Sequence, residues 1–203
     1  MANQEQKNNN SSHPVIAGDL CTLRPVEISD SEIIRQWRMS SHVAINFPSS
    51  FSVDSEQQVD WVNSILNNES VEYYIISENN QHKLVGLIFL QDIDRKNLNA
   101  EFGYYIGDLD YHGTGVAIDA EMLLLDHAFN SMGMHKIYCE SLEYNNNVLS
   151  LHKQFGFIQE GVRREHINKD GVWTSLVIMG VLKSEYTAAR EKIHTIIQSF
   201  TGR

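Results

Sequence analysis

The segment formed by residues 99–132 constrains the fold of this chain more than any other. It begins with a predicted strand, 99–106, continues through the loop YHGTGVA at 111–117, and ends in a long amphipathic helix. A helix N-terminus offers unpaired N–H groups and a partial positive charge, which suit a phosphate group. Gly113 and Gly115 leave room for a ligand to approach the backbone. The segment therefore predicts a helix packed on a sheet, with an anion site where the helix begins. A plain glycine turn is the alternative.

The elements on both sides of this segment are strands and helices in a defined order. Before it, the pattern predicts a strand (19–25), two helices (29–39 and 54–66) and two strands (71–77 and 83–92). After it come a strand (136–142), a short helix (145–156), a hairpin (157–167 and 172–182) and a closing helix (184–200). Ser29 with Glu32 has the spacing of a capping box for the first helix. The order predicts an α/β (α+β) fold: a single domain with a central mixed, mostly antiparallel sheet and helices on both faces.

The composition favours one folded domain behind a polar tail. Of the 203 residues, 42% are hydrophobic, which is enough for one ordinary core and short for two. Residues 1–17 are rich in Asn, Gln and Ser, which predicts a flexible tail and a domain over 18–203. The N-terminus lacks the apolar core of a secretory signal, and no stretch is apolar enough to span a membrane, so we expect a cytoplasmic protein.

Charge and cysteine content narrow the function classes. The formal net charge is -10, from 16 Lys and Arg against 26 Asp and Glu, so nucleic acid is not expected as a partner. The two cysteines, Cys21 and Cys139, are too few for a disulfide framework or a metal cluster, and no metal is expected. We interpret both as reduced and partly buried. The alternative is that one of them is an acyl-carrying nucleophile.

A second segment, NNNVLSLHKQFGF at residues 145–157, predicts an asparagine-capped helix that ends at Gly156. Val148, His152 and Phe155 share one face of this helix. His152 is either a functional imidazole or a core histidine that is hydrogen-bonded to the backbone. The earlier glycine loop is not a P-loop, because no Gly-Lys-Ser/Thr follows it, and it lacks the dinucleotide pattern G-x-G-x-x-G.

Together the two segments resemble the GNAT superfamily of N-acetyltransferases. His112-x-x-Gly115-x-Ala117 is similar to the family motif (Gln/Arg)-x-x-Gly-x-(Gly/Ala), whose loop holds the pyrophosphate of coenzyme A. Residues 145–157 resemble the later motif, which has an Asn, a helix with a Leu-Tyr pair, and Gly-Phe. The resemblance covers about residues 19–183 and implies a GNAT-like enzyme that uses acetyl-coenzyme A and no metal. Two positions depart from the family: His112 replaces Gln or Arg, and His152 replaces a Tyr thought to protonate the departing thiolate.

The resemblance also implies roles for individual residues. His152 is the expected general acid, and Glu101 or Glu140 the base that takes the proton of the amine. Each carboxylate has the alternative of a strand-end residue in a surface pair. Transfer is expected to be direct, without an acyl-enzyme, and a backbone N–H near Tyr105 or Ile106 is the expected oxyanion donor. The residues expected to bind the cofactor are Tyr105, Ile106, His112, Gly113, Thr114, Gly115, Val116, Ala117, Asn145 and Lys153.

Finer features divide between two branches of this family. Leu23-Arg24-Pro25 and residues 101–104 resemble acetyltransferases of ribosomal proteins. Residues 37–38, 92–97 and 151–157 resemble those of pseudaminic acid biosynthesis, which acetylate the 4-amino group of a UDP-linked deoxy aminosugar. This second branch implies a small-molecule amine acceptor, with Trp37 stacking on uracil and Arg38 binding a phosphate; for Trp37, a core position is the alternative. A protein N-terminus or another amine as acceptor, a non-catalytic acetyl-coenzyme A sensor, and a homodimer stay open.

Overall fold

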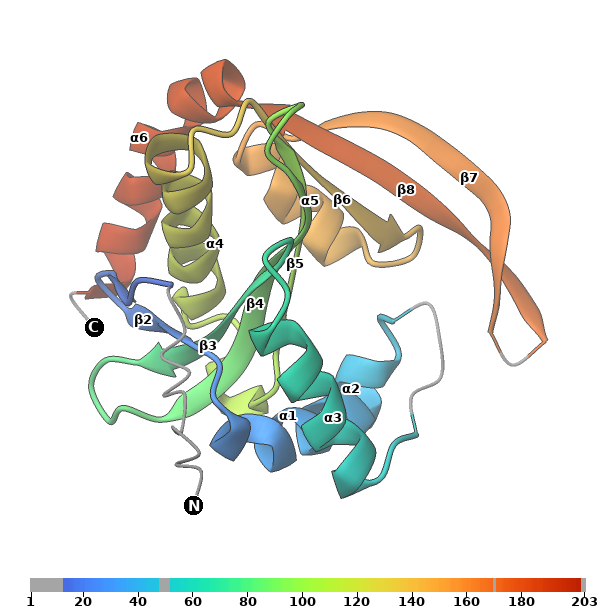
Figure 1. Ribbon diagram of the computed structural model, residues 1–203. Helices are drawn as coiled ribbons and strands as arrows, with labels where there is room; N and C mark the ends of the chain where they lie inside the picture. Colours follow the sequence, from blue (N-terminus) through green and yellow to red (C-terminus); the bar gives the residue numbers. More distant parts are fainter. Residues whose placement is uncertain (1–12, 48–51, 170, 202–203) are drawn as a thin grey trace.

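The computed structural model describes residues 13–47, 52–169 and 171–201, which form an eight-stranded sheet with helices on both faces (Figure 1). The strands are β1 (Ile16–Ala17), β2 (Cys21–Pro25), β3 (Glu72–Glu78), β4 (Leu84–Asp94), β5 (Asn99–Ile106), β6 (Lys136–Leu142), β7 (Ile158–Lys169) and β8 (Val172–Leu182). Their order across the sheet is β1-β2-β3-β4-β5-β6-β8-β7. The β5–β6 pair is parallel and the other pairs are antiparallel. The expected fold class is therefore confirmed.

Two groups of helices cover the sheet. The first face carries α1 (Ser31–Met39), α2 (Ser41–Ala44) and α3 (Ser55–Leu66), and the second carries α4 (Val116–Asp126) and α6 (Lys183–Thr201) (Figure 1). A π-helical turn (His127–Ser131) extends α4, α5 (Asn146–Gln154) follows β6, and two 3-10 turns lie at Ile28–Asp30 and Leu109–Tyr111. The sequence pattern located the longer helices and missed α2 and the 3-10 turns, because a periodic pattern needs more than three or four residues to be visible.

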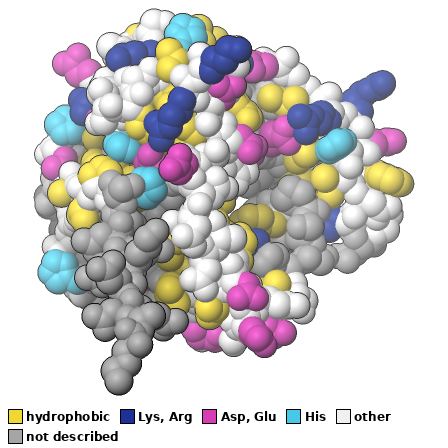
Figure 2. All heavy atoms as spheres, in the orientation of Figure 1, with side chains coloured by type: hydrophobic (Ala, Val, Ile, Leu, Met, Phe, Trp, Pro, Cys, Tyr) yellow, Lys and Arg dark blue, Asp and Glu magenta, His cyan; other side chains and the backbone are white. Residues whose placement is uncertain are grey.

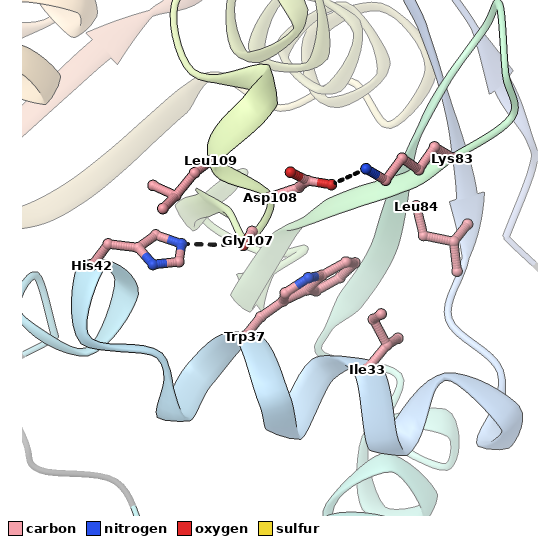
Figure 3. A pocket seen from close by; sticks show the side chains of 8 residues that line it. All are labelled: Ile33, Trp37, His42, Lys83, Leu84, Gly107, Asp108 and Leu109. Atoms are coloured by element: carbon pink, nitrogen blue, oxygen red, sulfur yellow. Dashed lines mark hydrogen bonds and ion pairs between the residues drawn. The ribbon is translucent and has the colours of Figure 1, made fainter.

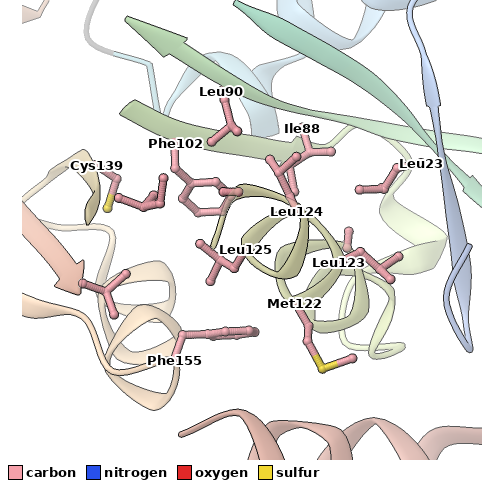
Figure 4. Close-up of a cluster of buried hydrophobic side chains, with 14 of the residues drawn as sticks. Leu23, Ile88, Leu90, Phe102, Met122, Leu123, Leu124, Leu125, Cys139 and Phe155 are labelled. Atoms are coloured by element: carbon pink, nitrogen blue, oxygen red, sulfur yellow. The ribbon is translucent and has the colours of Figure 1, made fainter. Parts of the chain in front are cut away.

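Burial on both faces explains why β4 is apolar along most of its length. Ile88 and Leu90 point into the larger core, and Leu87 points into the smaller core under α1 and α3. In the larger core, Leu124 and Leu125 of α4 pack against the face of the sheet that carries Ile88 and Leu90 (Figure 4). Because α4 lies between the sheet and α6, it is buried almost all round. This packing fixes both ends of α4 relative to β5.

The sequence predicts a domain that starts at residue 18, whereas the structure already has a strand before that residue. Residues 1–12 lie outside the described part of the chain. Ile16 and Ala17, however, pair with Leu23 and Thr22 and add β1 to the edge of the sheet. A two-residue strand has no detectable alternation, so the partner strand decides its conformation, and the local sequence does not.

The start of α1 also differs from the sequence expectation. Ser29 and Glu32 do not form the cap; a 3-10 turn precedes the helix, and Asp30 accepts a hydrogen bond from the N–H of Glu27 at 2.8 Å. Arg24 of β2 donates two hydrogen bonds, of 2.6 and 2.8 Å, to the same carboxylate. This contact between separate elements moves the cap to a position that local spacing does not reveal.

The cysteines, the length and apolarity of the helices, and the distribution of charged side chains were also considered from the sequence. Cys21 and Cys139 are both free cysteines, and they are fully buried, with 0% and 2% exposed, where partial burial was expected. None of the helices in the described ranges combines the length and apolarity that a bilayer crossing requires. On the face drawn in Figure 2, Lys and Arg side chains are interspersed with Asp and Glu. That face therefore lacks the continuous basic surface that binds a phosphate backbone.

Candidate functional site

The sheet opens between β5 and β6. These strands pair over three positions, the last of which joins Glu101 to Tyr138. Beyond it, β5 continues to Ile106 beside β4, and β6 continues to Leu142 beside β8, and within the described residues no strand pairs with the edges that face each other. Backbone N–H and C=O groups along separated edges can bind an extended polar ligand.

The glycine loop leads into α4, as predicted. Gly115 is the N-cap with φ 86°, and Gly113 has φ 75°, so both adopt the left-handed conformation that favours glycine. A methyl group at Gly113 would meet no atom within 4 Å, so the backbone there faces open space. No side chain caps the first turn of α4, and its N–H groups attract an anion. The hydroxyl of Thr114 donates to the carbonyl of Tyr111 at 2.8 Å and holds the shape of the loop.

Packing fixes the position of this loop. A Cβ on Gly115 would lie 2.7 Å from the ring of Phe200 and 2.9 Å from Leu20, so α6 and the β2 segment support the loop from one side. On the other side, Nε2 of His112 lies 3.2 Å from the carbonyl oxygen of Ile106. His112 therefore ties the loop to the end of β5, a structural role beyond the ligand contact expected for it.

The other residues expected at the cofactor lie on three different elements. They are Val116 and Ala117 in the first turn of α4, Tyr105 and Ile106 at the end of β5, and Asn145 and Lys153 near the two ends of α5. The ring of Tyr105 is buried in the smaller core, which leaves its backbone as the part beside the opening. Lys153 is exposed.

His152 lies in the larger core, beside the point where β5 and β6 separate. Its side chain is 3% exposed, and its Nδ1 lies 2.8 Å from Oε1 of Glu121 on α4. Glu121 is fully buried, and its Oε2 has no hydrogen-bond partner among the described residues. A charge in such a place is tolerated only when a partner compensates it, so the two side chains form a coupled buried pair.

Aromatic rings enclose the rest of this imidazole. They belong to Phe102, Tyr104 and Phe157, with centroids 5.6, 6.2 and 5.0 Å from that of His152. Burial lowers the pKa of His152, but the charge of Glu121 and hydrogen bonds with Cys139 and Glu121 outweigh this effect and raise the pKa to about 10. The surroundings of the side chain therefore favour its protonated form. His152 occupies a core position, with a carboxylate and not the backbone as its partner, and its functional role stays a prediction.

Glu101 points toward the opposite face of the sheet. It has the same parity along β5 as Tyr105, which packs in the smaller core, whereas Phe102 packs in the larger one. Gln91 Nε2 donates to Glu101 Oε2 at 3.0 Å. Burial is the main effect that raises the pKa of Glu101, and the charges of Glu140 and Asp92 add to it. A half-buried carboxylate with a raised pKa is suited to accept a proton.

Glu140 lies on the same face of the sheet as Glu101. Arg163 of β7 donates to it in a two-pronged ion pair, with distances of 2.8 and 3.1 Å. Tyr138, which precedes Glu140 on β6 and pairs with Glu101, has a raised pKa because of burial and because of the charges of Glu101, Asp92 and Glu140. We call Asp92, Glu101 and Glu140 the acidic cluster. The sequence predicted roles for Glu101 and Glu140 but not for Asp92. The backbone of Asp92 has φ 50° at an irregularity in β4, and this bend brings its side chain near the other two.

Trp37 and Arg38 are neighbours in α1 with different surroundings. The indole of Trp37 is 6% exposed and lies against Gly107, and it forms a wall of a pocket of about 540 Å³ (Figure 3). The guanidinium of Arg38 lies 5.1 Å from the ring centroid of Trp61 and 5.9 Å from that of Phe47. Burial lowers the pKa of Arg38. Trp37 is thus a core residue with one face toward a pocket.

The sequence did not identify Glu121, although one signal was available. It stands in the run AEMLLL, where a single charge interrupts apolar residues of a buried helix. Such a charge needs a buried partner, but the partner, His152, lies 31 residues away and is not identified by spacing. In the described ranges, no group of three or more His, Cys, Asp or Glu side chains is arranged to hold a metal ion.

Comparisons with known proteins identify the family of this chain. The family model described as acetyltransferase (GNAT) domain matches residues 21–158. The chain is 28% identical over 171 residues to a SPbeta prophage-derived N-acetyltransferase of Bacillus subtilis, a match that covers 83% of this chain and 93% of the relative. It is 26% identical over 168 residues to spermidine N(1)-acetyltransferase of Vibrio cholerae, covering 81% of this chain and 94% of that one.

A solved structure has the same fold. The spermidine N-acetyltransferase of Vibrio cholerae, in complex with CoA and spermine, superposes with a TM-score of 0.78 at 23% identity. The match covers 83% of this chain and 98% of that chain. At this identity the likeness concerns the fold alone.

Proposed function

This chain belongs to the acetyltransferase (GNAT) family and is an acetyl-coenzyme A-dependent N-acetyltransferase; on that premise, we propose that its acceptor is a cationic primary amine of the polyamine class. The observation that carries the proposal is the placement of ionisable groups around the β5–β6 opening. The acidic cluster lies on the face covered by α1 and α3, and the glycine loop and His152 belong to the α4 side. An amine and an acyl donor can therefore approach from opposite sides.

The residues of the opening fit acetyl-coenzyme A. The first turn of α4 has no side-chain cap, and the space beside Gly113 is open, so the N–H groups of residues 113–117 would hold the diphosphate. The unpaired edges of β5 and β6 would hold the extended arm. When bound, the group supplies a thioester as the acetyl source. We assign its contacts to the residues expected from the sequence, with Tyr105 and Ile106 acting through their backbone.

Two side chains would move protons in the transfer. An alkyl amine is mostly protonated at neutral pH, and Glu101 would take its proton directly or through water, because burial raises the pKa of this carboxyl. His152 would give a proton to the departing sulfur. Glu140 is bound to Arg163 and is better suited to shape the local potential than to accept a proton.

Charge supports a cationic acceptor. The charges of Asp92 and Glu140 raise the pKa of Glu101, and all three carboxylates raise the pKa of Tyr138, so they lie close enough to interact. Together they create a negative potential that attracts an ammonium group. Several relatives carry the name spermidine N(1)-acetyltransferase, in Vibrio cholerae and Escherichia coli. A polyamine would leave one ammonium near the cluster while the reacting nitrogen is deprotonated.

The UDP-linked aminosugar expected from Trp37 and Arg38 is the second candidate acceptor. It is supported by the pocket of about 540 Å³ beside the Trp37 indole, which could receive a base (Figure 3). The cation on that pocket, Lys83, is already paired with Asp108 at 2.6 Å, and a diphosphate near the acidic cluster would be repelled. The cationic amine is therefore preferred.

The test is acetyl transfer from acetyl-coenzyme A to spermidine, a UDP-4-amino sugar and a ribosomal N-terminal peptide, measured by thiol release. We expect the highest kcat/KM for spermidine, and a KM for spermidine that rises with salt because screening weakens the attraction. Preference for the sugar, together with UDP binding in calorimetry, would reverse the choice of acceptor. Binding of acetyl-coenzyme A without turnover of any acceptor would instead indicate a sensor.

A further inference from the structure

Glu121 is a buried ionisable group in contact with His152 that the proposed mechanism leaves unused. It lies about one and a half turns after the start of α4, is fully buried, and has one oxygen 2.8 Å from Nδ1 of His152. Its other oxygen has no hydrogen-bond partner among the described residues. Burying a carboxylate with an unsatisfied oxygen in an apolar helix destabilises a fold, so a purely structural role explains it poorly.

The location of the pair relates it to the reaction. His152 faces Phe102 and Tyr104 on β5 and Cys139 on β6. These residues immediately follow the last β5–β6 pair, Glu101 with Tyr138, on the strands that separate. The imidazole therefore lies where the opening begins, on the α4 face, with Nδ1 toward Glu121 of the helix and a hydrogen bond to Cys139 of β6.

We propose that Glu121 is a positioning residue that orients His152 through Nδ1 and keeps it doubly protonated, so that His152 can deliver its Nε2 proton to the coenzyme A sulfur. This inference rests on the proposed function. In the step, the nitrogen of the neutral amine forms the new bond to the acetyl carbon, the carbon–sulfur bond breaks, and the nitrogen releases its surplus proton to solvent. His152 then transfers one proton to the sulfur and becomes neutral, and it keeps its Nδ1 proton toward Glu121. A proton from solvent restores the imidazolium.

The groups around His152 support this assignment of charge. The ionisable side chains that face it are Glu121 from α4, Cys139 from β6 and Tyr104 from β5, and burial raises the pKa of Tyr104 so that it stays neutral. The remaining neighbours, Phe102 and Phe157, are aromatic rings. A cation is stabilised by an adjacent carboxylate and by aromatic rings, whereas neither favours a neutral imidazole.

The chain offers a matched control for a buried Glu–His pair. Glu72 of β3 lies 2.9 Å from Nε2 of His127, with 6% and 9% of the two side chains exposed. This second pair is in the same layer of the fold, at the far end of α4 from the glycine loop. Glu72→Gln should therefore reproduce the loss of a buried pair without touching the opening.

The experiment compares the unaltered enzyme with Glu121→Gln, Glu72→Gln and Cys139→Ala. Histidine side-chain NMR titration of the free proteins measures the protonation of His152, and the pH dependence of kcat with acetyl-coenzyme A and the preferred amine measures its use. In Glu121→Gln we expect the pKa of His152 to fall far below that in the unaltered protein, because burial then acts without the opposing charge of Glu121. We also expect kcat to fall by roughly 10- to 100-fold at pH 8 and further as the pH rises. Glu72→Gln should retain the shape of the unaltered profile, whereas Cys139→Ala should keep turnover and lower the pKa of His152 to a smaller extent than Glu121→Gln does, because one hydrogen bond to the imidazole is lost.

Three other outcomes would each contradict the proposal. If Glu121→Gln folds but leaves the titration of His152 and the pH profile unchanged, Glu121 does not position an acid. If Cys139→Ala abolishes turnover, the pair serves a cysteine nucleophile instead. If the unaltered protein shows the NMR titration but acetylates no amine, the proposed function fails and the proton-delivery role fails with it, while the coupling between the two side chains stands.

Discussion

Glu101 and His152 are ionisable side chains in opposite surroundings. Burial and the nearby charges of Glu140 and Asp92 raise the pKa of Glu101, and together they outweigh the hydrogen bond from Gln91, which lowers it. His152 has a carboxylate at 2.8 Å and is held as a cation. Pairs of groups whose surroundings separate their proton affinities are typical of acid–base sites. The role of Glu101 can be tested by the kinetics of a variant enzyme, and the charge of His152 by the pH dependence of protein stability.

Replacing Glu101 with Gln should lower kcat on the order of 100-fold, because the amide keeps the hydrogen-bonding shape but cannot take the proton. The KM for acetyl-coenzyme A should change little, since Glu101 points away from the α4 face. The control is Glu160→Gln on β7, whose exposed carboxylate pairs with Lys136 at 2.6 Å. Steady-state kinetics with saturating amine measure both. Equal kcat values for the two variants would exclude Glu101 as the base.

The His152 pair should also make stability depend on pH. Because the pKa of folded His152 is raised to about 10, its contribution is complete below the unfolded value of about 6.5 and is lost as the pH rises through about 10. Thermal unfolding of the unaltered protein and Glu121→Gln should therefore give a Tm difference that narrows between pH 7 and 10.5. A difference that stays constant over this range would mean that the pair carries no net protonation change on folding.

At the scale of elements, the loop before α4 depends on two glycines for different reasons. Gly115 combines φ 86° with close packing against Phe200, so a side chain there is excluded by both backbone and neighbours. Gly113 has φ 75° but open space around it, so only the conformation and the ligand constrain it. This difference permits a test that separates strain from binding.

The variant Gly113→Ala should cost about 1 kcal/mol of folding free energy and raise the KM for acetyl-coenzyme A roughly tenfold, because its methyl occupies the approach to the N–H groups. Gly133→Ala is the matched control, since Gly133 has φ 72° and a methyl group there would also meet nothing within 4 Å. It should lose similar stability and keep the KM unchanged. Calorimetric titration with coenzyme A and denaturant unfolding measure the two effects. An equal rise in KM in both variants would mean that strain alone is responsible.

At the scale of the whole molecule, a buried carboxylate joins the N-terminal part of the chain to its centre. Asp119 of α4 accepts hydrogen bonds from the N–H groups of Leu20, at 2.7 Å, and Cys21, at 3.0 Å. These bonds fix β2, and hence α1 that follows it, relative to the helix that carries the glycine loop. The two faces of the opening are therefore held in register by a contact between residues about a hundred positions apart.

Asp119→Ala should lower the free energy of unfolding by about 1–3 kcal/mol, because two buried N–H groups lose their acceptor. Asp60→Ala, on the exposed side of α3, should change it by less than about 0.5 kcal/mol. Urea unfolding followed by tryptophan fluorescence measures both. Similar stability in the two variants would show that water replaces the lost acceptor and that the contact does not support the fold.

The order of the long elements and the position of the glycine loop can be predicted from local sequence. Hydrophobic periodicity, turn residues and the need for positive φ at Gly113 and Gly115 act over a few neighbouring residues, so local pattern reports them. The assembled fold is needed to know which side chains meet: β1 pairs because β2 is there, Asp92 joins Glu101 and Glu140 because β4 bends, and Glu121 meets His152 across 31 residues. Charges act through space and in proportion to burial, and neither distance nor burial is encoded in spacing along the chain.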